Sequence, residues 1–192
     1  VGPGGGGRAK QVLALARPAQ LRVEVLGLLD PTVALLGTDG ARYRLVRSGD
    51  RHVETGPGHD ALLADVAGIS LTPAEAVRVL LGAPVAPDAR VSPGGAALGD
   101  GGVRALVARP DALEREALDF DAEGRLTRWA LLGADGAALL EAIYTDPRPA
   151  GDGWFAHAVE LRDAASGAVA RLTWSRVELD PPLDDALFAL PD

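Results

Sequence analysis

The stretch GISLTPAEAVRVLLGAP, residues 68–84, has the start and stop signals of a helix, inside a chain that otherwise has the pattern of β-strands. Thr72 is a favoured N-cap, Pro73 suits the first helical position, and Glu75 stands where a capping box needs it. A glycine and a proline end the pattern. The spacing predicts a short helix over 73–81, and its apolar face consists of Ala76, Val77, Leu80 and Leu81.

A second helical segment comes just before it. In HDALLADVAG, residues 59–68, Leu62, Leu63 and Val66 recur at helical spacing and a glycine follows. This predicts another short helix at about 59–67. Two amphipathic helices therefore interrupt a chain of strands.

The residues upstream of these helices alternate as half-buried strands do. Leu21, Val23 and Val25 fall on one side of a strand, and the turn dipeptide Asp39-Gly40 joins strands at 33–38 and 42–47. More strands are predicted at 51–55, 103–109, 113–121, 125–133, 138–146, 153–163 and 168–180. The Pro- and Gly-rich residues 86–102 are predicted to be a loop.

About ten or eleven strands in meander order predict a mainly β (α+β) fold, a single curled antiparallel sheet with two inserted helices. A length of 192 residues fits one domain. The prediction is therefore a flexible Gly-rich linker over 1–7 and a single domain over 8–192.

The composition excludes several classes of protein. A net charge of −8 and a pI near 4.9 argue against a nucleic-acid partner, and the preference for Arg over Lys indicates a GC-rich genome. The absence of cysteine removes disulfides, thiolate nucleophiles and Cys-based zinc sites. No apolar run is long enough to predict a transmembrane helix. Because the chain starts at Val1 and contains no Met, we expect that an upstream segment is missing from this sequence. A signal peptide or a lipid-anchor cysteine could lie in that segment.

No motif predicts catalysis, a metal ion or a cofactor. There is no Gly-x-Ser-x-Gly elbow, and the Gly-rich residues 92–102 lack the Lys-Ser/Thr of a phosphate loop. The remaining polar candidates are better explained as surface or turn residues than as metal ligands or acid–base catalysts: His52, His59, His157, Asp119, Asp121 and Glu123. The chain is therefore predicted not to be an enzyme.

What the chain has in excess is apolar surface. If the sheet curls, its concave face would be lined by Leu21, Val23, Val25, Tyr43, Leu45, Leu118, Phe120, Trp129, Leu131, Phe155, Val159 and Leu161. The two helices would cover that face as a lid with Leu62, Leu63, Val66, Val77, Leu80 and Leu81. The residues alone leave two alternatives, a packed core capped by helices or a hydrophobic cavity under a movable lid.

Four stretches in this order resemble the LolA/LolB lipoprotein-carrier superfamily, and in particular the LolB-like lipoproteins of Gram-negative bacteria. They are ARPAQLRVEVLG (16–27), VALLGTDGARYRLV (33–46), LLGAP (80–84) and DDALFALP (184–191). The resemblance covers residues 8–192. It implies a half-open antiparallel β-barrel whose mouth is plugged by helices and whose interior binds acyl chains.

The resemblance also implies a role. Proteins of this superfamily take part in lipoprotein transport to the outer membrane, so the expected partners are a lipid or acylated lipoprotein, a periplasmic carrier protein and a membrane surface reached through an upstream anchor. The expected location is the periplasm or the periplasmic face of the outer membrane. Leu28 and Leu29 are the candidate for a membrane-facing loop. The alternative is a sensor or scaffold domain of the same fold that binds a protein partner, and an undetected hydrolase is the remaining class.

Overall fold

A computed structural model gives the structure of the chain and describes residues 8–27, 29, 31–49, 53–84, 90–91, 95–108 and 115–188. The chain divides into two compact units. Unit 1 comprises Val1–Leu62, Thr72–Val77 and Pro182–Asp192, and unit 2 comprises Leu63–Leu71 and Arg78–Pro181. The predicted linker over 1–7 lies outside the described residues. The prediction that 8–192 form one domain stays a prediction.

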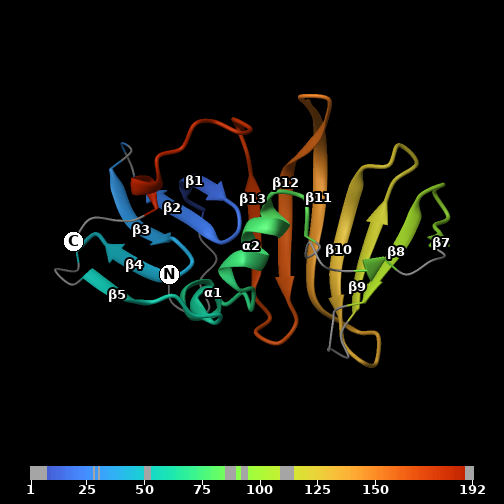
Figure 1. Cartoon of the computed structure of the whole chain (residues 1–192), viewed down its shortest axis with the longest axis horizontal. Helices are drawn as coiled ribbons and strands as arrows, with labels where there is room; N and C mark the ends of the chain where they lie inside the picture. Colours follow the sequence, from blue (N-terminus) through green and yellow to red (C-terminus); the bar gives the residue numbers. More distant parts are fainter. Residues whose placement is uncertain are drawn as a thin grey trace. The chain divides into compact units, whose positions relative to one another are not determined.

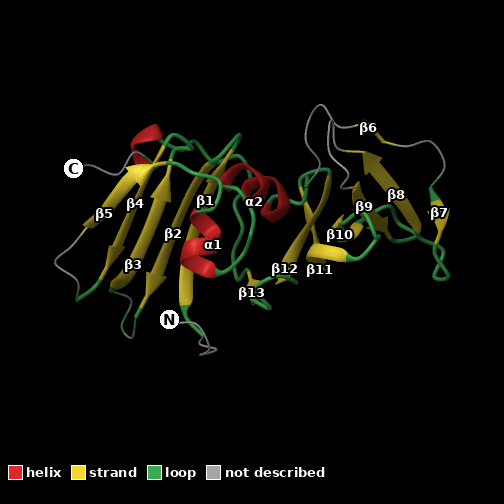
Figure 2. Ribbon diagram, turned by 90° about the horizontal axis from the view of Figure 1, so that it is seen from below, coloured by secondary structure: helices red, strands yellow, loops and turns green. Residues whose placement is uncertain are grey.

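Unit 1 is built on a five-stranded antiparallel sheet in the order β1-β2-β3-β4-β5, whose strands lie side by side in Figure 2. Its strands are β1 (Lys10–Ala16), β2 (Gln20–Leu26), β3 (Thr32–Thr38), β4 (Arg42–Arg47) and β5 (Val53–Pro57). The predicted turn between β3 and β4 is present. Gly40 in this turn has φ = 92°, the positive value that a tight hairpin turn needs. The buried Thr38 closes this turn by accepting a hydrogen bond from the Gly40 amide.

The C-terminal segment also belongs to unit 1. The short 3-10 helix η1 (Asp185–Leu187) precedes Phe188, whose side chain is buried. Arg22 of β2 donates a hydrogen bond from Nη1 to the Leu187 carbonyl at 2.9 Å. The first and last stretches of the resemblance are therefore in direct contact within one unit.

Unit 2 contains an eight-stranded antiparallel sheet in the order β13-β12-β11-β10-β9-β8-β6, with β7 also paired to β8 (Figure 1). Its strands are β6 (Arg90–Val91), β7 (Ala96–Ala97), β8 (Val103–Ala108), β9 (Arg115–Phe120), β10 (Leu126–Leu132), β11 (Ala138–Ala150), β12 (Gly153–Asp163) and β13 (Val169–Thr173).

The two helices form where the sequence predicts them, α1 at Leu62–Ala67 and α2 at Pro73–Leu80. The capping box of α2 is complete, since the Glu75 amide bonds Thr72 Oγ1 and the Glu75 carboxylate accepts from the Thr72 amide. At the other end Gly82 has φ = 70°. The Gly82 amide bonds the Val79 carbonyl and the Ala83 amide bonds the Arg78 carbonyl, which is a Schellman motif.

The mainly β class, with two short helices and antiparallel sheets that do not close into a barrel, is confirmed for the described residues. In detail the prediction of one sheet is wrong, because the described strands form two. The chain leaves β5 into helices, and β6 pairs with β8 instead of continuing the meander. The predicted loop over 86–102 also contains β6 and β7, which are too short to give a sequence pattern.

Strand β11 extends beyond the predicted end at residue 146, as far as Ala150. Its pairing with β10 ends at Ile143, whereas its pairing with β12 continues to Ala150. Pro147 and Pro149 therefore lie where β11 has a neighbouring strand on one side only. A strand tolerates proline better there than between two neighbouring strands. The result is a long hairpin between β11 and β12.

One face of the eight-stranded sheet carries an alternating row of charges, here called the charge ladder. Its members, in order across six strands, are Arg104, Asp119, Arg128, Glu141, Arg162, Glu160 and Arg171. Successive members lie 2.5–3.5 Å apart between nitrogen and oxygen. The Arg104 guanidinium beside Asp119 lowers the pKa of that carboxyl. This face therefore carries charge across the sheet beside the small buried residues Ala117 and Ala130, and the large buried apolar side chains lie mainly on the opposite face.

Candidate functional site

The predicted apolar residues of unit 1 lie on one face of its sheet. Directly paired residues share a face, as do residues two apart on one strand. The registers of β2, β3 and β4 therefore place five of them together: Leu21, Val23, Val25, Tyr43 and Leu45. Leu21 and Leu45 are buried, and the other three are half-buried.

The predicted apolar residues of unit 2 lie mainly on the sheet face opposite the charge ladder. Trp129 pairs with Leu118 on one side and Ala142 on the other, and Ala142 pairs with Leu161. Leu131 and Val159 fall on the same face two residues away, and all the predicted side chains of this group are buried: Leu118, Trp129, Leu131, Val159 and Leu161. We call this the apolar face of unit 2.

Two predicted residues stand at the margin of that group. Phe120 pairs with Val103 at one end of β9 and is half-buried. Phe155 lies on the part of β12 that pairs with β11 alone, opposite Arg148. Its ring meets His157 edge-on, at 6.2 Å between centroids.

A buried carboxylate lies on the apolar face of unit 2, and the sequence did not single it out. Glu116 pairs with Leu131 and is 3% exposed, and its Oε2 accepts a hydrogen bond from Trp129 Nε1 at 2.8 Å. A carboxylate in such surroundings needs polar partners, since burial without them is costly. Trp129 therefore both fills the face and supplies one of those partners.

The lid residues are largely buried. Leu62, Leu63, Val77 and Leu80 are buried, whereas Val66 and Leu81 are half-buried. The helical spacing in the sequence therefore identified side chains that are buried or half-buried in the folded protein. Their role as a lid stays a prediction.

Within unit 2, a hydrogen bond from Tyr144 links the end of α2 to the apolar face. Tyr144 of β11 is buried and donates its hydroxyl hydrogen to the Val79 carbonyl at 2.9 Å. Burial raises the pKa of Tyr144, so the hydroxyl stays protonated and can donate. Tyr144 is in phase with the apolar residues of β11, and a buried tyrosine usually requires a partner. The sequence could not name that partner.

The connection between the helices is attached at a second place. Asp163 at the end of β12 accepts a hydrogen bond from the Ser70 amide at 2.7 Å, and Ser166 Oγ donates to the Gly68 carbonyl at 2.6 Å. Burial raises the pKa of Asp163, but hydrogen bonds from Ser166 and Ser70 outweigh it and hold this pKa below its ordinary value. The attachment at Asp163 is charge-assisted, unlike the one at Tyr144.

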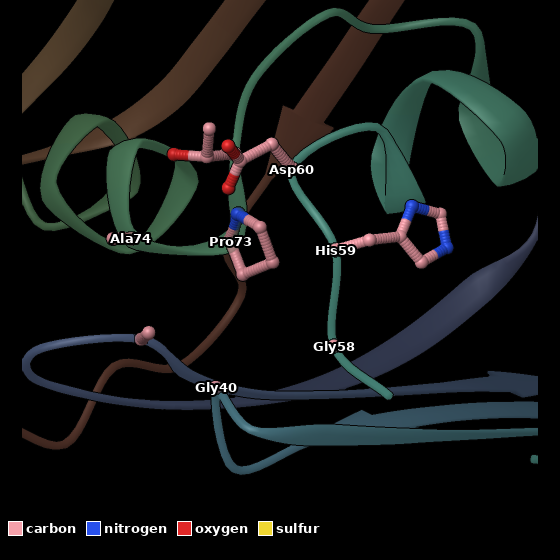
Figure 3. Close-up of a pocket in the computed structure, with 8 residues that line it drawn as sticks. Gly40, Gly58, His59, Asp60, Pro73 and Ala74 are labelled. Carbon is pink, nitrogen blue, oxygen red and sulfur yellow. The ribbon is translucent and has the colours of Figure 1, made fainter. Parts of the chain in front are cut away.

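A small pocket lies in unit 1 beside the start of α2 (Figure 3). Its volume is about 130 Å³, below the roughly 300–1,000 Å³ of typical ligand pockets. Figure 3 shows the Asp60 carboxylate pointing toward Pro73, while the His59 ring points away from it. The lining residues are Ala19, Gly40, Gly58, His59, Asp60, Thr72, Pro73 and Ala74. None of the predicted cavity residues lines this pocket.

The loop between β2 and β3 presents one residue to solvent. Leu29 is 100% exposed and has φ = 70°, a backbone region that leucine rarely adopts. The other predicted loop residue, Leu28, lies outside the described residues. The structure thus holds one apolar side chain fully in water at this turn.

Polar groups that could carry chemistry are dispersed. Within the described ranges no group of three or more His, Cys, Asp or Glu side chains could hold a metal ion. Asp119 belongs to β9 and the charge ladder, and Asp121 and Glu123 belong to the β9–β10 turn. His52 lies outside the described residues. No described helix has the length and hydrophobicity needed to cross a membrane.

Comparison with known proteins places the fold. No protein-family model matches the chain, and no curated protein matches it. A LolA superfamily protein of Nitrosomonas europaea is similar in structure, with a TM-score of 0.59 and 13% identity over 93% of this chain and 80% of that one. An outer membrane lipoprotein-sorting protein domain of Vibrio parahaemolyticus is also similar, with a TM-score of 0.54 and 12% identity over 92% of this chain and 78% of that one.

A DUF1329 family protein of Desulfovibrio piger gives a TM-score of 0.51 and 11% identity, over 88% of this chain and 75% of that one. At such identities the likeness concerns the fold. The fold of this chain is LolA-like, as the sequence resemblance predicts.

Proposed function

We propose that this protein holds the acyl chain of a lipid or lipoprotein in a hydrophobic cavity that includes the apolar face of unit 2, with α1 and α2 as a lid. It would act without catalysis or cofactor, in lipoprotein or lipid transport to the outer membrane. The observation that carries this proposal is the apolar face of unit 2, on which α2 is held at its end by a neutral hydrogen bond from Tyr144. The LolA-like fold supports it.

The mechanism would be an exchange of apolar contacts. Burying an acyl chain of about 16 carbons, at about 0.8 kcal/mol per methylene, stabilises the bound state by on the order of 12 kcal/mol. Escape into water would be too slow to be useful, so release requires a direct hand-over to a carrier or receptor. When the lid swings aside, the chain replaces the lid's own side chains, such as Val79 and Leu80, which are buried when the lid is closed. Closed and filled states then differ by only a few kcal/mol.

Removing the Tyr144 hydroxyl tests this exchange. Tyr144→Phe deletes the bond to Val79 and leaves the ring in place, so it favours the open lid by about 1 kcal/mol. We expect a diacylated peptide to bind about fivefold more tightly to the variant, as measured by native mass spectrometry and by displacement of an apolar fluorophore.

The matched control is Thr127→Val, since Thr127 also donates its hydroxyl to a backbone carbonyl of unit 2, that of Asp119. It should leave uptake unchanged. If neither the wild type nor Tyr144→Phe takes up the peptide or the fluorophore, the carrier proposal is wrong.

Leu29 is the proposed membrane-facing residue. Its φ of 70° and full exposure favour a small or polar residue at this position, so an apolar contact made elsewhere would explain a leucine. Leu29→Gly should relieve the backbone and leave folding intact, while retention on phosphatidylethanolamine–phosphatidylglycerol vesicles falls several-fold. Val12→Ser, at another exposed apolar residue of unit 1, is the control. Equal retention of Leu29→Gly and wild type would remove this role.

A sensor or scaffold domain with a packed core is the second candidate. It is favoured by the burial of Leu118, Trp129 and Leu131, which leaves these side chains little contact with water. Such a protein would bind a partner at the envelope and take up no lipid. The uptake experiment separates the two candidates.

A further inference from the structure

The hairpin between β11 and β12 extends beyond its neighbours. The pairing of β11 with β10 ends at Ile143, and that of β12 with β13 ends at Ala158, but β11 and β12 stay paired as far as Ala150 and Gly153. Figure 1 shows these two strands, in orange, reaching past β10. We call residues 145–157 the arm. Within it β11 and β12 pair with each other, and at its base the His157 carbonyl also accepts a hydrogen bond from the Trp174 amide at 2.8 Å.

The arm carries an exposed tryptophan. Trp154 pairs with Pro149 and is 54% exposed, although tryptophan is one of the side chains that gain most from burial. The Arg125 guanidinium lies over its ring, 5.3 Å from the centroid. Arg125 is itself held by Asp121 at 2.6 Å and Glu123 at 2.8 Å. The indole is therefore fixed in orientation on one side while much of its surface stays open.

The charges around this tryptophan have a negative excess. The β9–β10 turn supplies Asp121 and Glu123 against Arg125. The turn of the arm adds Asp152, two residues before Trp154, whereas the register places Arg148, which pairs with Asp146, on the opposite face of the arm. A rigid aromatic ring in negative surroundings attracts cations through the ring face and through long-range electrostatics. An anionic membrane surface would be repelled by the same charges.

We propose that the arm, with Trp154 at its centre, is a docking surface for a basic, arginine-bearing segment of a partner protein. An incoming guanidinium would stack on the open part of the indole, and the carboxylates of Asp152 and Glu123 would complement the segment's other charges. Arg125 would act as a positioning residue, since it fixes the ring before the partner arrives. The proposal is independent of acyl-chain binding.

The test uses the full chain and a defined probe, an N-acetylated, C-amidated arginine hexapeptide. Titration is followed by the NMR signal of the Trp154 indole N–H, identified from its absence in Trp154→Phe. We expect this signal to shift in the wild type. The affinity, measured for every variant by isothermal titration calorimetry, should fall about tenfold in Trp154→Ala. Asp152→Asn should weaken binding about twofold, and added salt should weaken it in all variants that keep the tryptophan.

The control is Leu139→Ala, at an exposed apolar residue of β11 that lies outside the arm. It should bind the probe like the wild type. Three results would each overturn the proposal: no shift in the wild type, equal affinity of Trp154→Ala and Leu139→Ala, or equal binding of a glutamate hexapeptide. Retention of the wild type, and not of Trp154→Ala, on phosphatidylglycerol vesicles would instead assign the arm to a membrane.

Discussion

Replacing Trp129 with alanine is expected to lower the free energy of unfolding by about 3–5 kcal/mol. Two effects act together. The side chain is 3% exposed at the centre of the apolar face of unit 2, and its indole donates to the buried carboxylate of Glu116. Truncation leaves a cavity and also takes a hydrogen bond from a buried polar group. Urea unfolding followed by far-UV circular dichroism measures the loss.

Trp129→Phe separates the two effects, because the ring still fills the face while the N–H is gone. Its expected cost is about 1–3 kcal/mol, the usual penalty for removing one partner of a buried polar group. A loss below about 1 kcal/mol for Trp129→Ala would contradict the packing around Trp129. It would show that this side chain contributes little to the core of the folded state.

The double substitution Leu80→Gln, Leu81→Gln is expected to have the largest effect on ligand uptake. Leu80 is buried, so its replacement puts an amide where the closed lid provides apolar contacts and costs about 1–3 kcal/mol. Under the carrier proposal that cost falls on the closed lid, and uptake of an apolar fluorophore rises about tenfold or more. Ala67→Gln, at an exposed position of α1, is the matched control.

The same variant distinguishes the proposed functions. In a packed core, the substitutions lower the free energy of unfolding by several kcal/mol and uptake stays at the wild-type level. Fluorophore titration and urea unfolding on one preparation give both quantities. A destabilised variant without added uptake would favour the sensor or scaffold alternative.

The sequence predicted best the features that depend on neighbouring residues. Thr72, Glu75 and Gly82 cap α2 through contacts within a few positions, and the Asp39-Gly40 turn sets the register of β3 and β4 locally. Alternation alone identified most of the apolar faces. These signals need no knowledge of the distant chain.

The sequence did not predict the contacts between distant residues. Tyr144 meets Val79 across 65 positions, and Asp163 meets Ser70 across 93. In each hydrogen bond one partner is a backbone group, and nothing in the amino-acid sequence distinguishes that backbone group from any other. The division of the strands into two sheets is missed for the same reason, since it depends on which strands pair and not on how each one alternates.

The charge ladder has a consequence for association between molecules. An open sheet ends in a strand with unsatisfied backbone groups, which invites another chain to add to it. Here the last strand, β13, is only five residues long and carries Arg171, which is 71% exposed and bound to Glu160. Addition of a second strand there would displace or crowd a paired, hydrated guanidinium. The ladder thus protects against edge-to-edge aggregation, so this sheet can stay open in a crowded compartment.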